Sequence, residues 1–179
     1  MAIKTASGSD LRNSLSSGLV LLNTTSFSGV SSQSINDVFS ATYDNYRIIF
    51  SSNISTGNNN QLRVRMRVAG SDNSTSNYFF AGFQLNSNAS TGVAFSGETQ
   101  TSGQLLILDT GVRMMGSMDV LSPFLSQKTI ITGLGQRVAN HNMTMNFVEV
   151  ELTTSFTGFT IFPNTGTITG EVSVYGYNK

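Results

Sequence analysis

From Leu19 onward, apolar and polar residues alternate with a period of two, which is the pattern of β-strands with one buried face. The clearest segment is Leu62–Val68, where four apolar residues alternate with three arginines. A one-residue shift of register would bury all three arginines, so the register of this strand is strongly determined. Similar patterns predict further strands at Gly18–Phe27, Ser34–Phe39, Tyr46–Ile54, Tyr78–Leu85, Gln104–Leu108, Gly116–Leu121, Thr129–Gly133, Met143–Leu152, Phe156–Phe162 and Thr167–Tyr177.

Turn-forming residues separate these segments, at Ser55–Asn60, Gly70–Asn77, Asn86–Gly92, Gly97–Gly103 and Pro163–Gly166. About ten or eleven short strands without a crossover helix are typical of two packed antiparallel sheets. The sequence therefore predicts an all-β fold, an antiparallel β-sandwich of the jelly-roll type.

The sequence contains no linker that would divide it, so we expect one sandwich domain over residues 18–179 and an N-terminal arm over residues 1–17. In the arm, Leu11 and Leu15 are four residues apart, as on one face of a short helix. So short a helix is not stable alone. The arm must therefore pack on its own domain or on a partner, and we expect it to serve docking or assembly.

One predicted strand has apolar residues in both phases. Met143, Met145 and Phe147 share one phase, whereas Val148, Val150 and Leu152 share the other. A β-bulge near Phe147–Val148 would place all of them on one face. A sheet with both faces covered would accept them without a bulge, and an oligomer interface produces that arrangement.

Charge and composition argue against several classes of function and site. Charged residues are 11% of the chain and the net charge is zero, whereas Ser, Thr and Asn together occupy 63 of 179 positions. A neutral chain is a poor nucleic-acid binder, because phosphate contacts need a surplus of basic residues. The absence of Cys excludes disulfides and thiolate metal sites, and the apolar runs near the start are too short for a signal peptide or membrane span.

No complete catalytic set is present. The run from Leu105 to Leu108 ends in Asp109-Thr110-Gly111, which resembles the aspartic-protease signature, and a dimer could bring two such loops together. The apolar-Gly segment Ile130–Gly133 follows too soon to brace the loop as in that family, and a strand that ends in Asp-Thr-Gly is ordinary turn chemistry. His141 is the only histidine, so no multi-histidine metal site can form. We expect no cofactor and no metal.

Charged and aromatic residues provide candidate contacts. Arg63, Arg65 and Arg67 share one strand face, and Glu149 and Glu151 form another same-face pair. Three interpretations are open: pairing of these groups across strands or subunits, a solvated face, or a patch that contacts an anion or glycan. Tyrosines offer large contact areas, so Tyr175 and Tyr177 join the interface candidates together with Leu11 and Leu15. Candidate receptor contacts in loops are Asn58, Asn59, Asn73, Tyr78, Asn88 and His141.

Several stretches resemble a known family. The segments GLVLLNTTSF and SSQSINDVFSATYDNYRIIF (residues 18–27 and 31–50), LRVRMRVAGSDNSTSNYFF (residues 62–80) and TGEVSVYGYNK (residues 169–179) are similar to virion surface proteins of tailed bacteriophages, common in marine and cyanobacterial phages. These proteins are usually described as tail-fibre-like. The resemblance implies a β-sandwich that trimerises and is joined to the virion by a short N-terminal segment, here residues 1–17.

Together, these observations predict a non-enzymatic structural protein on a phage virion, a homotrimer that acts as a tail-fibre component, a host-attachment head or a capsid decoration. Its partners would be copies of itself, other virion proteins and a host surface glycan, but neither nucleic acid nor a membrane. The alternatives are a glycan-binding module without a virion role and an aspartic-protease-like enzyme that uses Asp109.

Overall fold

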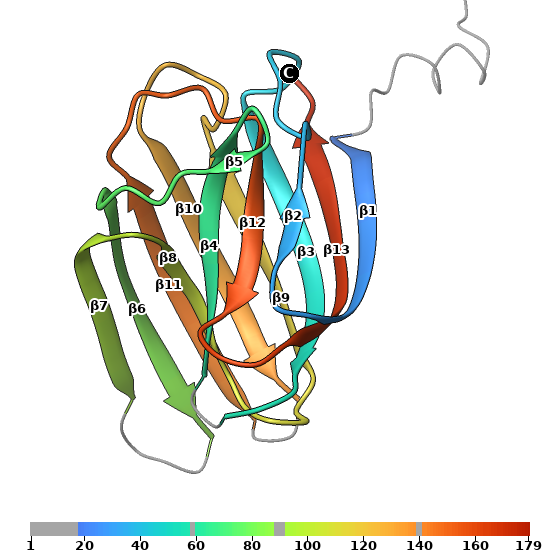
Figure 1. Cartoon of the computed structure of the whole chain (residues 1–179), viewed down its shortest axis with the longest axis vertical. Helices are drawn as coiled ribbons and strands as arrows, with labels where there is room; N and C mark the ends of the chain where they lie inside the picture. The colour runs from blue at the N-terminus through green and yellow to red at the C-terminus, as the bar shows by residue number, and fades with distance from the viewer. Residues whose placement is uncertain (1–17, 58–59, 88–91, 139–140) are drawn as a thin grey trace, which may run out of the picture.

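The chain folds into two facing antiparallel sheets, which confirms the predicted all-β sandwich (Figure 1). The computed structural model describes residues 18–57, 60–87, 92–138 and 141–179. The predicted arm, residues 1–17, lies outside the described residues. The strands are β1 (Leu19–Val30), β2 (Gln33–Ile35), β3 (Asn45–Ile54), β4 (Asn60–Val68), β5 (Ser71–Asp72), β6 (Tyr78–Asn86), β7 (Val93–Gln100), β8 (Gly103–Leu108), β9 (Met114–Leu121), β10 (Thr129–Arg137), β11 (Asn142–Val150), β12 (Gly158–Pro163) and β13 (Ile168–Tyr177).

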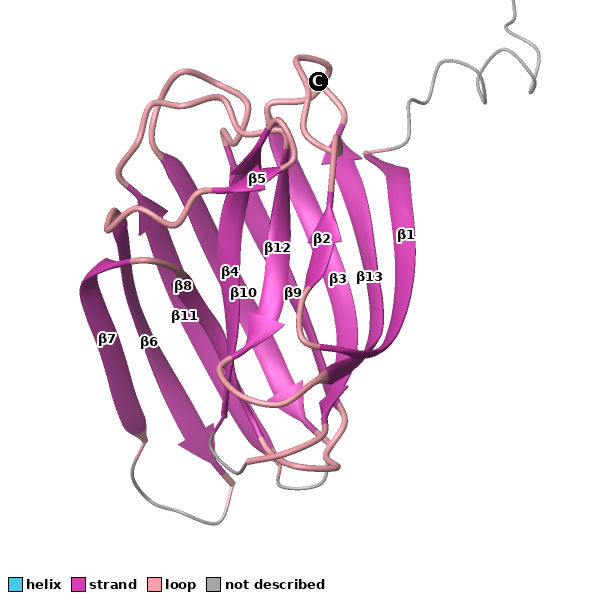
Figure 2. Cartoon of the chain, in the orientation of Figure 1, coloured by secondary structure: helices cyan, strands magenta, loops and turns pink. Residues whose placement is uncertain are grey.

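The larger sheet has eight strands in the order β1-β13-β3-β9-β10-β11-β6-β7. The smaller sheet has the order β2-β12-β4-β5, and β8 pairs with β4 beside β5. Figure 2 shows the smaller sheet lying across the larger one, with strands and loops but no helix among the described residues. The chain passes repeatedly from one sheet to the other, and the jelly-roll subtype stays a prediction.

The core fills the space between the sheets. In β4, Leu62, Val64 and Met66 are buried and the arginines between them point outward, as the alternation predicted. The rings of Phe39 and Phe159 stack with their centroids 5.8 Å apart. Burial of such large apolar side chains is the main force that holds the two sheets together.

The structure corrects several predicted boundaries. Only Gln33–Ile35 of the region around Ser34–Phe39 forms a strand, because the chain then turns toward β3. The predicted turns at Gly70–Asn77 and Gly97–Gly103 contain β5 and the end of β7. β7 is an edge strand with little apolar alternation, and most of its residues are exposed in the described part of the chain.

Of the two interpretations of Met143–Leu152, the β-bulge at Phe147–Val148 is excluded. The pairing of β11 with β10 and β6 runs without a register shift from Asn142 to Val150. Strict alternation therefore points Val148 and Val150 into the core, while Met145 and Phe147 are exposed on the opposite side.

The prediction for Tyr78 is also corrected: Tyr78 is a core residue and not a receptor contact in a loop. Its side chain is fully buried at the start of β6. The phenol donates a hydrogen bond to the Asn73 carbonyl oxygen over 2.9 Å and accepts one from the Met66 amide over 2.9 Å. Burial raises the pKa of Tyr78 to about 12.

This raised pKa predicts an alkaline loss of stability. The folded state retains the Tyr78 proton to about pH 12, whereas an unfolded tyrosine loses it near pH 10. The free energy of unfolding should therefore fall above pH 10, by about 1.4 kcal/mol per pH unit from this group. Urea unfolding between pH 8 and 11 measures this slope, and Tyr78→Phe should reduce it. An unchanged slope in the variant would contradict the assignment to Tyr78.

Candidate functional site

The outward side of the larger sheet carries a contiguous group of exposed apolar side chains. Ile49, Ser117, Leu134, Met145 and Phe83 form one row across five neighbouring strands, because they are direct cross-strand partners. We use the name apolar face for the large side chains in and around this row, which are 38–53% exposed: Ile49, Phe83, Leu85, Met115, Leu134, Met145 and Phe147. A contiguous exposed apolar surface of this kind marks a binding or assembly site.

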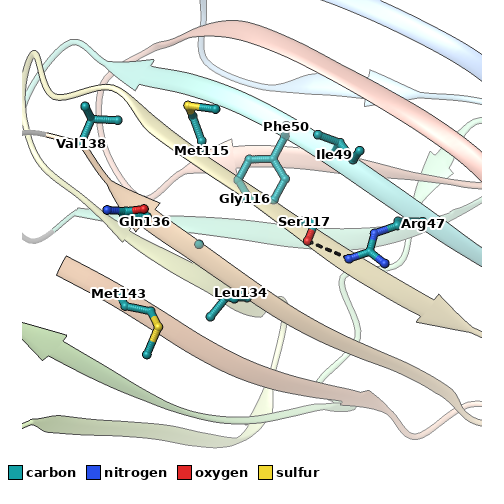
Figure 3. A pocket seen from close by; sticks show the side chains of 11 residues that line it. Arg47, Ile49, Phe50, Met115, Gly116, Ser117, Leu134, Gln136, Val138 and Met143 are labelled. Atoms are coloured by element: carbon teal, nitrogen blue, oxygen red, sulfur yellow. Dashed lines mark hydrogen bonds between the residues drawn. The ribbon is translucent and has the colours of Figure 1, made fainter. Parts of the chain in front are cut away.

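A hollow of about 590 Å³ lies within this surface (Figure 3). Ile49 and Met115 line it on one side and Leu134 and Met143 on the other, with Gln136 between them. On the core side of the sheet, Gly116 and Gly135 are direct partners in β9 and β10. A Cβ on Gly116 would come within 2.7 Å of the Phe50 ring, and one on Gly135 within 2.6 Å of Leu106. Core packing therefore accounts for these two glycines.

A polar network borders the hollow. The Arg47 guanidinium donates to Ser117 Oγ over 3.2 Å and lies 3.9 Å from Asp119 Oδ1. Tyr177 donates its hydroxyl proton to the same carboxylate oxygen over 2.6 Å. Partial burial, followed by the hydrogen bond to Asp119, raises the pKa of Tyr177. Tyr175 is the cross-strand partner of Arg47. The two tyrosines singled out in the sequence thus lie beside the apolar face.

The two glutamates bind a lysine rather than the arginines. Glu149 and Glu151 each accept a bond from Lys128 Nζ over 2.6 Å. β11 pairs with β10 and β6 in the larger sheet, whereas the arginines lie on β4 in the smaller sheet. Pairing between these groups on neighbouring strands is therefore wrong, because the two strands belong to different sheets. Pairing between subunits stays a prediction.

Asp109 has a structural partner. It follows β8 and forms an ion pair with Arg137 of β10, and the two side chains are only 13% and 5% exposed. Its carboxylate compensates a buried guanidinium charge, which would otherwise be very costly to place in the core. This contact accounts for Asp109 without any catalytic role.

The loop candidates do not gather at one place. Asn73 accepts hydrogen bonds from the Thr75 amide over 3.3 Å and from Thr75 Oγ1 over 2.7 Å, so it shapes the turn after β5. His141 is exposed before β11 with φ 50°. The start of β11 and β5 lie at opposite ends of the sandwich (Figure 1). The remaining candidates lie outside the described residues: Leu11, Leu15, Asn58, Asn59 and Asn88.

In the described part of the chain, no group of three or more His, Cys, Asp or Glu side chains is close enough together to hold a metal ion. No segment of that part forms a helix long and apolar enough to cross a membrane.

Comparisons with known proteins identify no family. No protein-family model matches the chain, and no curated protein is significantly similar to it. Among solved structures, the crystal structure of Caenorhabditis elegans galectin LEC-6 aligns over 89% of this chain and 96% of that chain, with 10% identity and a TM-score of 0.36. A TM-score this low carries no inference about ligand or function.

Sequence reasoning missed most of the apolar face. The signal that could have found it was the apolar content of both phases in Met143–Leu152, together with Met115 and Leu134. The alternation alone could not decide between a bulge and a second apolar face. The unbroken register of β11 decides it.

The buried ion pair yields a stability prediction. Asp109→Asn should lower the free energy of unfolding by about 3 kcal/mol, because Arg137 would remain buried and charged. Replacement of both residues, with Asp109→Asn and Arg137→Met, should recover most of the loss. Urea unfolding measures both variants, and Glu98→Gln at an exposed position should change stability by less than about 0.5 kcal/mol. Equal effects of Asp109→Asn and Glu98→Gln would refute a structural role.

Proposed function

We propose that this chain is a non-enzymatic structural subunit that self-associates through its apolar face into a homotrimer. The apolar face is the single observation that carries the proposal. Its seven large side chains lie on neighbouring strands in one sheet and are left exposed by the chain's own fold. Association would be stabilised by about 25 cal/mol for every Å² of apolar surface that a second subunit removes from water.

The surroundings of the apolar face suit a protein interface. Interfaces commonly have an apolar centre and a polar rim. Here the Arg47–Asp119–Tyr177 network lies along one border, and Lys128 with Glu149 and Glu151 provides charged groups at another. Met115 and Met145 belong to the apolar centre, and the flexible side chains of methionines adapt to a facing surface. A closed cyclic assembly would bury this face in every copy.

The resemblance to tailed-phage proteins supports a place for this assembly on a virion. In this proposal residues 1–17 attach the trimer to another virion protein, and the sandwich projects as a tail-fibre component, a host-attachment head or a capsid decoration. The richness in Ser, Thr and Asn and the low charge suit a surface exposed to water and salt.

A glycan-binding module is the second candidate, and the hollow is the observation that favours it. Its volume of about 590 Å³ lies within the range of small-ligand sites. Arg47, Ser117 and Gln136 provide polar groups at its wall. In this case a glycan array should detect binding that Arg47→Ala removes, and the protein should sediment as a single chain.

The self-association proposal predicts a loss of trimers when charges enter the apolar face. Leu134→Lys combined with Met145→Lys should convert a mass of three chains into that of one chain, because two desolvated ammonium groups would face the interface. Analytical ultracentrifugation measures the mass. Thr24→Lys is the control, since Thr24 is exposed on the same sheet but outside the apolar face. A single-chain mass for the unmodified protein would overturn the proposal.

The proposed attachment predicts a separate effect of the arm. A chain that starts at Gly18 should still form trimers, because the apolar face is intact, but should no longer join phage particles. Co-sedimentation with purified particles, compared with the full chain, measures incorporation. Retained incorporation of the shortened chain would exclude residues 1–17 as the attachment segment.

A further inference from the structure

The outward side of the smaller sheet holds two arginines that pair with no carboxylate in the described part of the chain. Most of the described cations do form ion pairs: Arg47, Arg67, Lys128, Arg137 and Lys179. Arg63 and Arg65, two residues apart on β4, contact no carboxylate within the described residues. Alternation places both on one face, about 7 Å apart along the strand.

Arg63 is held in place by neutral groups. Its Nε donates to Ser102 Oγ over 2.8 Å, and its terminal nitrogens donate to Gln61 Oε1 over 2.8 Å and to the Ser102 carbonyl oxygen over 3.3 Å. Its Cζ lies 5.8 Å from the centre of the Phe80 ring. Burial, followed by the charge of Arg65, lowers the pKa of Arg63. The guanidinium is thus fixed, but no carboxylate of the described residues compensates its charge.

Arg65 is fixed at one end and open at the other. Its Nε donates to the Thr101 carbonyl oxygen over 3.0 Å, and its Cζ lies 4.8 Å from the centre of the Phe162 ring. Its two terminal nitrogens have no acceptor within the described residues. A guanidinium in this state presents a planar fork of N–H donors that matches two oxygens of an anion.

Arg67 lies on the same strand but, unlike Arg63 and Arg65, forms an ion pair. Its guanidinium pairs with Asp72 and donates to Asn36 Oδ1 and Thr160 Oγ1, each over 2.8 Å. Both its charge and its donors are therefore satisfied within the chain. Arg63 and Arg65 lack this compensation although they share the strand face, and the repulsion between them would be relieved by an anion.

We propose that Arg63 and Arg65 bind a phosphate or sulfate group. Two oxygens would accept from the fork of Arg65, and a third would accept from the remaining donors of Arg63. Such a group has the three oxygens that this geometry requires, whereas a carboxylate has two. Because both guanidiniums are already held by rings and hydrogen bonds, little side-chain entropy would be lost on binding. The site lies on the other sheet from the apolar face and does not depend on it.

The test uses the full chain at low ionic strength, where screening is weak. Inorganic phosphate and dextran sulfate are titrated in separate calorimetric experiments, with neutral dextran as the blank. Arg65→Gln and Arg63→Gln should each weaken binding about tenfold or more, as expected for loss of a charge-assisted hydrogen bond. Arg113→Gln is the matched control, because Arg113 is exposed and its side chain bonds only to Ser51 Oγ among the described residues. It should change affinity less than about twofold.

The two probes distinguish a site for a free anion from a site for a polymer-borne group. Binding of inorganic phosphate that requires Arg65 supports a site for a free anion, and much tighter binding of dextran sulfate supports a site for a polymer-borne group. Absence of binding to both probes, or an equal loss with Arg113→Gln, would overturn the proposal. If Arg65→Gln unfolds, Arg65→Lys decides: it keeps the charge but removes the fork, so unweakened binding would refute bidentate recognition.

Discussion

The unbroken antiparallel register in the middle of the larger sheet is the constraint on which the rest of the structure depends. β9, β10 and β11 pair without a bulge, so each successive residue must point to the opposite side of the sheet. The inward set, which includes Val148 and Ile131, completes the core. The outward set, which includes Leu134 and Met145, is then necessarily exposed. A bulge would have hidden part of this set, but β11 pairs with β10 and β6 over its whole length without a register shift.

The two sheets present different chemistry on their outward sides. The larger sheet exposes the apolar face, and the smaller sheet exposes the arginines of β4. This division suits a subunit that buries one side against other copies and leaves its opposite side to solvent. Two buried polar groups find partners within the chain: Asp109 pairs with Arg137, and the Tyr78 hydroxyl bonds to the backbone of Asn73 and Met66. These pairs explain two residues that, in the sequence, suggested chemistry or ligand contact.

The paired and unpaired charges also differ in their location. Lys128 lies beside Glu149 and Glu151 because β10 and β11 are neighbours. Among the described residues, the arginines of β4 face no carboxylate except Asp72, since β12 supplies Thr160 and Phe162 at the facing positions. Strand order, rather than the number of acids and bases in the chain, therefore decides which charges are compensated. In a chain with zero net charge, it leaves a local positive surplus.

The sequence by itself determined the fold class, most of the strands and the outward direction of the arginines in β4, because these follow from the local two-residue period. It could not reveal β7, whose positions alternate weakly at a sheet edge, nor the burial of Tyr78, which depends on packing against β4. The partners of Glu149, Asp109 and Arg63 were decided only by the tertiary structure. The physical reason is that alternation specifies which side of a strand a residue faces, whereas its neighbours depend on strand order, and strand order is set by contacts between residues far apart in the chain.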